Sequence, residues 1–255
     1  MSIFVEIDRL NIAIAGASRG IGLGFVTQLL QYPRIGKIYG MYRDRETASE
    51  LFSLQEQCDR LTCLPMDITD ERQIIATVEE IGKECDRLHW VINCVGLLHE
   101  GELQPEKGLR QLNAENLSRY FQVNSIGAVL LAKHVLPLLR HGDRSLLATI
   151  SAKIGSIGDN RLGGWYGYRA SKAALNMLMK TAAIEYARKS PKTVIIMLHP
   201  GTTDTRLSRP FQRNVPPEKL FSIERTVTQL LAVIDKIESD DSGKFFSWDG
   251  SLLPW

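Results

Sequence analysis

The sequence predicts an α/β protein, built as one doubly wound domain with a parallel seven-stranded sheet and helices on both faces. Short apolar runs alternate along the chain with longer segments of helical periodicity, and strand–helix alternation of this kind is typical of a parallel sheet. Several runs are apolar at consecutive positions, as in strands that are buried on both faces. A glycine-rich turn joins the first run to the first helical segment.

The predicted elements follow one another in a regular order. Runs with strand composition lie at 11–15, 37–42, 61–66, 90–95, 145–150, 193–198 and 244–248. Amphipathic segments that predict helices lie between them at 20–32, 46–57, 70–82, 113–140, 170–189 and 223–238. Asp70, with Gln73 three residues later, predicts a capping box at the start of the third helix. The segment 200–222 is rich in Pro and Arg and lacks periodicity, which predicts a lid loop over a substrate.

Length and composition fit one domain over residues 1–255. Of the 255 residues, 44% are hydrophobic and 24% charged, so the chain can bury a core without metals or disulfides. The net charge of +2 is too small for a dedicated nucleic-acid-binding protein. The four cysteines show no CxxC pair and no histidine at zinc spacing, which predicts free thiols in a reducing cytoplasm and no metal site.

We also expect neither a signal peptide nor a membrane-spanning segment. The first residues lack a basic stretch before their apolar run. No run approaches the ~18 consecutive apolar residues of a membrane helix.

The turn after the first predicted strand reads Gly16-Ala17-Ser18-Arg19-Gly20-Ile21-Gly22 and continues into a helix. Glycine there permits a tight turn, lets backbone N–H groups approach a pyrophosphate, and allows the helix to pack closely on the strand. The spacing is GxxxGxG, but a strand before it and a helix after it are the context that a dinucleotide site requires. The turn therefore predicts a Rossmann-type cofactor site lined by Gly16, Ser18, Arg19, Gly20, Ile21 and Gly22.

The end of the second predicted strand distinguishes the two nicotinamide cofactors. An Asp or Glu there would bind the ribose 2′-hydroxyl of NAD, but this chain has Tyr42 and then Arg43. Arg43, together with Arg19 of the glycine-rich turn, suits a dianionic 2′-phosphate. The sequence favours NADP(H) over NAD(H), while Asp44 leaves open a contact with a ribose hydroxyl.

Tyr168 and Lys172 predict acid–base chemistry. They stand four residues apart and so share one face of the helix that follows the strand at 145–150. A phenol is a poor base at neutral pH because its pKa is about 10, but a neighbouring ammonium stabilises the phenolate. The pair could then exchange a proton with a carbonyl oxygen at the carboxyl edge of the sheet.

These motifs resemble those of the short-chain dehydrogenases/reductases, which are NAD(P)-dependent oxidoreductases with one Rossmann-type domain. The matching pieces are GASRGIG at 16–22, Asp67, Asn93-Cys94-Val95-Gly96, Asn124, Tyr168 with Lys172, and Pro200-Gly201 followed by Thr205. The stretch 155–177 is further similar to the C-factor/sniffer-like carbonyl reductase branch.

The resemblance implies a role for each matching residue. Tyr168 would be the general acid/base, Lys172 would hold the nicotinamide ribose and lower the pKa of the tyrosine, and Asn124 would anchor a water beside Lys172. The remaining residues would line the cofactor, with Asp67, Ile68, Asn93 and Gly96 at the adenosine end and Pro200, Gly201, Thr203 and Thr205 at the nicotinamide end.

The chain departs from the family at the catalytic serine, which polarises the substrate carbonyl. Strict alignment puts Ala152 in that place, with Ser151 one residue earlier and Ser156 four later. We expect Ser151 to take the role, with Ser156 or no serine as alternatives. The position required of a donor to a developing oxyanion decides between them.

The sequence thus predicts an NADP(H)-dependent oxidoreductase that reduces an aldehyde or ketone to an alcohol, or catalyses the reverse. Its partner would be a small-molecule carbonyl or alcohol rather than a nucleic acid or a membrane. The resemblance also implies a homodimer or homotetramer formed through the helices at 113–140 and 170–189. The alternative is an NADP-binding protein with a signalling or regulatory role and little catalysis. Three arginines of the 200–222 loop, Arg206, Arg209 and Arg213, are expected to form a solvated basic lid.

Overall fold

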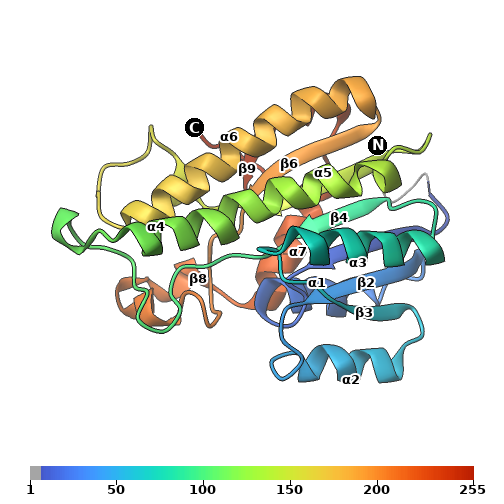
Figure 1. The fold of residues 1–255 in the computed structure, drawn as a ribbon, viewed down its shortest axis with the longest axis horizontal. Coiled ribbons are helices and arrows are strands. Elements are labelled where there is room, and N and C mark those ends of the chain that lie inside the picture. The colour runs from blue at the N-terminus through green and yellow to red at the C-terminus, as the bar shows by residue number, and fades with distance from the viewer. Residues whose placement is uncertain (1–6) are drawn as a thin grey trace.

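The computed structural model describes residues 7–255 and confirms the predicted α/β fold (Figure 1). Seven parallel strands form one sheet in the order β3-β2-β1-β4-β5-β6-β9. Their bounds are Leu10–Ala15 (β1), Ile35–Tyr42 (β2), Leu61–Pro65 (β3), Trp90–Asn93 (β4), Ser145–Ile150 (β5), Thr193–His199 (β6) and Lys244–Ser247 (β9). The strand order reverses between β1 and β4, and doubly wound folds bind ligands at the carboxyl ends of strands at such a switch point.

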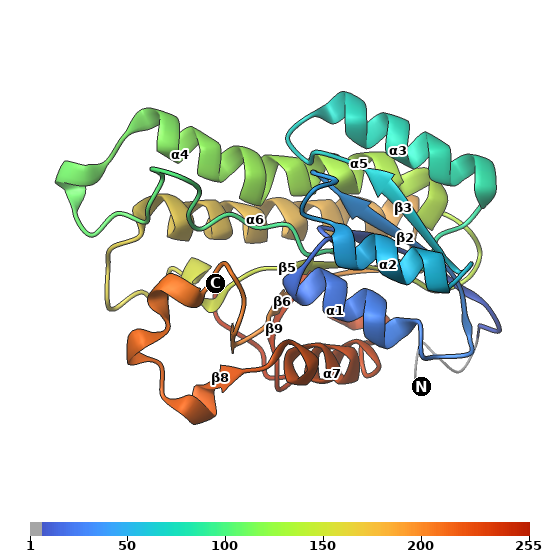
Figure 2. The same ribbon diagram turned by 90° about the horizontal axis from the view of Figure 1, so that it is seen from below.

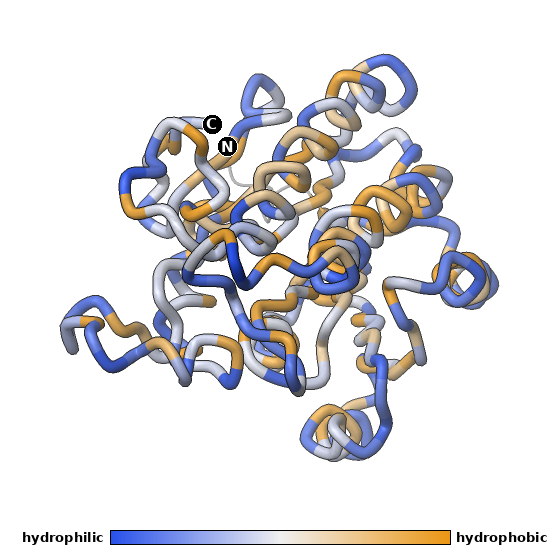
Figure 3. Tube along the Cα trace, turned by 60° about the vertical axis from the view of Figure 1, so that its left-hand side comes forward, coloured by the Kyte–Doolittle hydropathy of each residue, from blue (hydrophilic) through white to orange (hydrophobic). Residues whose placement is uncertain are grey.

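Helices cover both faces of the sheet (Figure 2). One face carries α1 (Gly20–Leu29), α2 (Ser49–Gln57) and α7 (Ile223–Ile234), and the other carries α3 (Glu71–Glu84), α4 (Ala114–Phe121), α5 (Gly127–Leu139) and α6 (Tyr166–Lys189). Strand side chains alternate between the two cores: Ile12 and Ile14 pack with the first group of helices, Ala13 and Ala15 with the second. Strands that supply two cores have no polar face, which explains their consecutive apolar residues. Figure 3 shows the complementary pattern in the helices, whose turns alternate between hydrophobic and hydrophilic residues.

The predicted helix 113–140 is divided by a π-helical turn at Gln122–Ile126, between α4 and α5. Such a turn inserts an extra residue and is common at functional sites. Asn124 lies in this turn and is buried. The run Ala114–Leu139 is long and apolar enough to cross a membrane, with a mean hydropathy of 1.3, but 50% of its most apolar window is buried in the protein. The core helix of a globular domain meets the same criterion.

Helix α6 begins at Tyr166, earlier than the predicted start at residue 170. Tyr168 therefore belongs to the first turn of the helix. Trp165, which precedes the helix, has a left-handed backbone with φ of 52° and ψ of 42°. A non-glycine residue adopts this conformation only where its surroundings hold it, and the backbone carbonyl of Glu106 accepts a hydrogen bond from Trp165 N at 2.5 Å.

The start of α3 differs from the predicted capping box. Asp70 does cap the helix, because its side chain accepts a hydrogen bond from Arg72 N at 3.0 Å. The Gln73 amide, however, donates to the Asp70 carboxylate at 3.2 Å and accepts from Asp67 N at 2.9 Å. The backbone N–H of Asp70, which a capping box would satisfy, already donates to the Asp67 carbonyl at 3.0 Å.

The 200–222 segment, predicted to be irregular, contains a parallel pair of short strands, β7 (Thr202–Thr203) and β8 (Leu220–Phe221). It packs against the start of α6 and the loop after β4. The rings of Phe211 and Trp165 lie 4.8 Å apart between centroids, and His99 Nε2 lies 3.2 Å from the Arg206 carbonyl oxygen.

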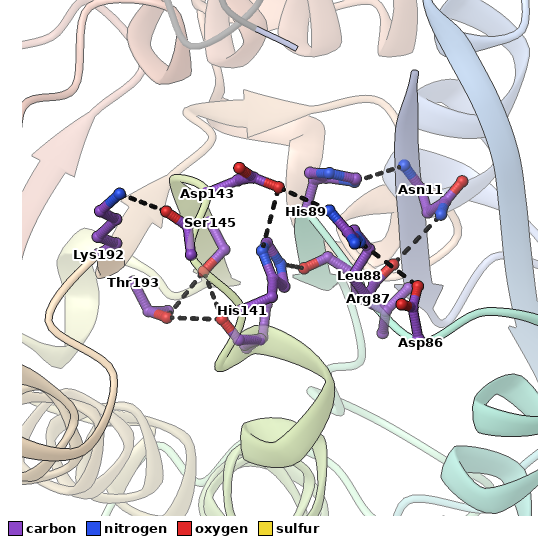
Figure 4. A network of polar contacts seen from close by, with 12 residues as sticks. Asn11, Asp86, Arg87, Leu88, His89, His141, Asp143, Ser145, Lys192 and Thr193 are labelled. Atoms are coloured by element: carbon purple, nitrogen blue, oxygen red, sulfur yellow. Dashed lines mark hydrogen bonds and ion pairs between the residues drawn. The ribbon is translucent and has the colours of Figure 1, made fainter. Parts of the chain in front are cut away.

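A polar network ties the strands together at the amino-terminal edge of the sheet (Figure 4). His89 Nδ1 accepts a hydrogen bond from Asn11 N at 2.9 Å, and the rings of His89 and His141 meet edge to face at 5.2 Å. Asp143 pairs with Arg87 at 3.1 Å. Burial and the neighbouring His141 lower the pKa of His89 to about 4. His89 is therefore a neutral acceptor at neutral pH.

Candidate active site

The glycine-rich turn has a backbone that requires glycine. Gly16 and Gly20 have left-handed φ values of +77° and +57°, and a Cβ on Gly22 would lie 2.1 Å from the Gly16 carbonyl oxygen. Arg19 precedes α1 and supplies no side-chain acceptor to the helix. The first N–H groups of α1 therefore face the carboxyl edge of the sheet without a side-chain cap, which suits an anion. The other predicted residues of the turn, Ser18 and Ile21, are half-buried.

The residues predicted at the adenosine end lie just beyond β3 and at the end of β4. The Asp67 carboxylate accepts hydrogen bonds from Thr69 N at 2.8 Å and Thr69 Oγ1 at 2.7 Å. The Asn93 side chain accepts from the backbone two residues later at 3.1 Å. The Ile68 carbonyl lies so close to Gly127 that a Cβ there would approach it to 2.5 Å. Asp67 and Asn93 are thus held by local hydrogen bonds and Ile68 by packing against α5, all at the carboxyl edge of the sheet.

Arg19, Arg43 and Arg206 share one neighbourhood at this edge. Burial lowers the pKa of Arg19, and the positive charges of Arg206 and Arg43 lower it further. The negative charges of Asp44 and Glu100 raise the pKa of Arg19 and so partly offset these effects. The 200–222 loop therefore contributes the exposed Arg206 to the positive charge around the glycine-rich turn. Like charges gather in this way where a polyanion can be bound.

Tyr168 and Lys172 lie at the carboxyl end of β5. Tyr168 is 7% exposed and Lys172 is 3% exposed. Lys172 Nζ donates to the Ile150 carbonyl at 3.0 Å and lies 5.9 Å from the centre of the Tyr168 ring. Burial lowers the pKa of Lys172 to about 8 and raises the pKa of Tyr168. The phenol therefore keeps its proton at neutral pH, which is the form that can donate to a carbonyl oxygen.

Asn124 joins the loop after β4 to α6. Its Oδ1 accepts from Leu97 N at 2.7 Å, while its Nδ2 donates to the Leu97 carbonyl at 2.9 Å and to Ser171 Oγ at 3.0 Å. A Cβ on Gly96 would lie 3.8 Å from Asn124 Oδ1 and 3.7 Å from Lys172 Nζ. The structure thus brings Asn124, Gly96 and Lys172 together from three separate segments.

The two candidate serines make different hydrogen bonds. Ser151 Oγ donates to Asn176 Oδ1 at 2.6 Å, so its proton is directed into the contact between β5 and α6. Ser156 Oγ accepts from Asp159 N at 3.1 Å, which leaves its own proton available. Both serines are buried. Its free proton makes Ser156 a candidate donor to substrate beside Ser151, which the sequence favoured.

The residues predicted at the nicotinamide end lie at the start of the 200–222 segment, directly after β6. Gly201 has a left-handed φ of +72° and packs against Phe221, where a Cβ would approach to 2.6 Å. Thr203 Oγ1 lies 2.9 Å from Thr226 Oγ1 and 3.5 Å from the Pro200 carbonyl. Thr205 lies beside the glycine-rich turn, since its Cγ2 would be 3.5 Å from a Cβ on Gly20.

Glu106 is a residue of this region that no sequence pattern marked. It is 2% exposed, and its Oε2 accepts a hydrogen bond from Gly167 N, one residue before Tyr168, at 3.1 Å. Its Oε1 is buried without a hydrogen-bond partner. Glu106 stands in a stretch without strand or helix periodicity, so only its tertiary position identifies it as the acceptor for the start of α6.

The glycine-rich turn and the arginines around it suit an organic anionic cofactor. Within residues 7–255 no group of three His, Cys, Asp or Glu side chains could hold a metal ion, and the cysteines at positions 58, 63, 85 and 94 are free thiols. The tight glycine-rich turn and the gathered arginines fit the pyrophosphate and phosphate groups of a dinucleotide.

Comparisons with known proteins agree with this arrangement. The family model described as short chain dehydrogenase matches residues 10–216. The C-signal protein of Myxococcus xanthus is 31% identical over 147 residues, which is 58% of this chain and 83% of that protein.

Two solved structures are similar over nearly the whole chain. The NADPH-bound carbonyl reductase from chicken fatty liver has a TM-score of 0.87 at 27% identity, covering 97% of this chain and 100% of that one. Carbonyl reductase Sniffer of D. melanogaster has a TM-score of 0.85 at 25% identity, covering 98% and 100%. The chain therefore belongs to the short-chain dehydrogenase/reductase family and is an NAD(P)-dependent oxidoreductase.

Proposed function

We propose that this protein is an NADP(H)-dependent carbonyl reductase with Tyr168 as its general acid/base. The observation that carries the proposal is the buried pair of Tyr168 and Lys172 at the end of β5. When bound, the nicotinamide supplies a hydride to the substrate carbonyl carbon. Tyr168 donates its phenolic proton to the carbonyl oxygen, and the Lys172 ammonium stabilises the phenolate that is left. Asn124 holds the loop that carries Gly96 against Lys172.

The preference for NADP(H) over NAD(H) is supported by the arginines. Arg19, Arg43 and Arg206 provide guanidinium groups beside the end of β2, where the adenosine ribose would lie. A 2′-phosphate satisfies them through charge-assisted hydrogen bonds, and a ribose hydroxyl does not.

A substrate screen tests the proposal. Oxidation of NADPH and of NADH would be followed spectrophotometrically with a panel of aldehydes, ketones and quinones. We expect turnover of at least one compound class with NADPH, at a higher kcat/KM than with NADH. Binding of NADPH without turnover of any compound would contradict the proposal.

The same screen addresses the second candidate, an NADP-binding protein with a signalling role. Similarity to a C-signal protein favours it. The set of Tyr168, Lys172 and Asn124 argues against it, because a protein that only binds the cofactor does not need an acid–base pair.

We further propose a homodimer or homotetramer in the cytoplasm. Ile126 lies in the π turn, and Met177 and Ile184 lie in α6. Their side chains are 46%, 67% and 51% exposed, which suits an interface between copies. The substrate would be a small carbonyl compound or alcohol under the 200–222 lid, within one domain. Sedimentation velocity of wild type and Met177→Glu tests the assembly: the substitution should shift the protein toward monomer, and an unchanged sedimentation coefficient would contradict this interface.

A further inference from the structure

Glu100, in the loop after β4, holds two arginines at once. Its Oε1 lies 3.1 Å from Arg43 Nη2, and its Oε2 lies 3.1 Å from Arg119 Nη2 and 3.3 Å from Arg119 Nε. Burial opposes ionisation of Glu100, but the bonds from Arg119 and Arg43 outweigh it and hold its pKa below the usual value. Glu100 is therefore an ionised carboxylate bound to Arg43, the arginine that the sequence assigns to a 2′-phosphate.

The neighbouring acid, Asp44, is engaged differently. Its Oδ1 accepts a hydrogen bond from Glu46 N at 3.0 Å, so this oxygen is used within its own turn. Glu100 is thus the carboxylate that the described structure places directly on Arg43.

We propose that Glu100 is an exchangeable counter-anion of the phosphate site, which occupies Arg43 until a cofactor 2′-phosphate takes its place. The proposal rests on the proposed NADP(H) function. Before binding, Glu100 offsets the mutual repulsion of Arg19, Arg43 and Arg206. On binding, Arg43 transfers to the phosphate, and Glu100 remains on Arg119.

The exchange is physically reasonable because the two contacts differ in strength. The Arg43 and Glu100 side chains are 50% and 40% exposed, and an ion pair this exposed adds little stability. A dianionic phosphate can accept two parallel hydrogen bonds from one guanidinium and carries more charge. NAD(H) has no group that could displace Glu100, so Glu100 reduces NADP(H) affinity through competition for Arg43 and leaves NAD(H) affinity unchanged.

The test measures binding rather than turnover. Dissociation constants for NADPH, NADH and adenosine 2′,5′-bisphosphate would be determined by calorimetry at low ionic strength. The variants are Glu100→Gln, Arg43→Ala and the double substitution. The matched control is Glu80→Gln, which removes an exposed glutamate paired with Lys83 at 2.7 Å on α3.

We expect Glu100→Gln to bind NADPH and the bisphosphate about two- to fivefold more tightly, with NADH affinity unchanged. In the Arg43→Ala background the gain should disappear, because the competition is for Arg43. Glu80→Gln should match wild type.

Two results would overturn the proposal. Weaker NADPH binding by Glu100→Gln would mean that Glu100 orients Arg43 for the phosphate. An equal gain with and without Arg43 would mean simple charge repulsion without exchange. Failure of the NADP(H) proposal itself is seen separately, as equal affinity of the wild type for NADPH and NADH.

Discussion

The ammonium of Lys172 donates a hydrogen bond to the backbone carbonyl of Ile150, the last residue of β5, at 3.0 Å. This bond connects the helix that carries Tyr168 to the carboxyl edge of the sheet. It also partly compensates the burial of a charged group, which would otherwise be costly. The position of the acid–base pair thus depends on the contact between β5 and α6.

The lowered pKa of Lys172 predicts that the activity of the enzyme falls at basic pH. Burial lowers its pKa to about 8, so above that pH the free enzyme loses the charge that stabilises a Tyr168 phenolate. We expect kcat/KM for NADPH in the reduction direction to fall as pH rises above about 8, since this parameter reports groups of the free enzyme. Lys172→Met should lower kcat/KM and abolish this fall. The same fall in Lys172→Met would show that another group titrates.

Two single substitutions distinguish the roles of Ser151 and Ser156. Ser156→Ala should lower kcat about 100-fold with unchanged NADPH affinity, because it removes a donor to the developing oxyanion. Ser151→Ala should lower the unfolding temperature, because it removes the hydrogen bond to Asn176, and should reduce kcat less. The opposite ranking of the two kcat values would assign the catalytic role to Ser151.

Glu106 is predicted to fix the first turn of α6. Glu106→Ala removes the acceptor for Gly167 N and should cost about 1–3 kcal/mol in the free energy of unfolding, measured with urea. Glu106→Gln keeps an oxygen in the same place and should recover most of that loss. If both variants unfold like wild type, this hydrogen bond does not stabilise the start of the helix.

The histidine network predicts a loss of stability in acid. The pKa of His89 is lowered by burial first and by His141 and Arg87 next, while Asp143 and Asp86 oppose the shift, leaving it at about 4. The unfolded chain binds a proton on this histidine below its ordinary pKa of about 6.5, and the folded protein does so only below about 4. Stability from this group is therefore present above the unfolded pKa and is lost as pH falls between the two values, by about 3 kcal/mol at most.

Urea unfolding of wild type and His89→Gln at several pH values measures this effect. The variant should be less stable than wild type at neutral pH and should show a shallower decline between neutral and acidic pH. His199 is a second contributor, because burial lowers its pKa to about 4 as well, so part of the decline should persist. Parallel curves for the two proteins would show that His89 does not contribute.

Local patterns predicted the elements of this protein well. Strands β1 and β5 pack residues into two cores, and this leaves consecutive apolar runs that the sequence displays directly. The glycines at 16, 20 and 22 and the Tyr168–Lys172 spacing are also local, because each depends on one turn or one helix face.

Features that depend on distant segments were not predictable in this way. The π turn around Asn124 and the burial of Glu106 against α6 arise from packing between elements. The direction of the Ser151 proton depends on Asn176, which stands 25 residues later. The proximity of Arg206 to Arg19 likewise depends on how the 200–222 loop folds back.

Tyr168→Phe tests the central claim most directly, because it removes only the phenolic hydroxyl from a buried ring. NADPH dissociation constants and kcat with the best carbonyl substrate would be measured for wild type and variant. We predict NADPH affinity within about twofold of wild type and a kcat lowered by about 10²- to 10⁴-fold, the contribution of a positioned general acid. A variant that binds NADPH normally and retains wild-type kcat would contradict the account.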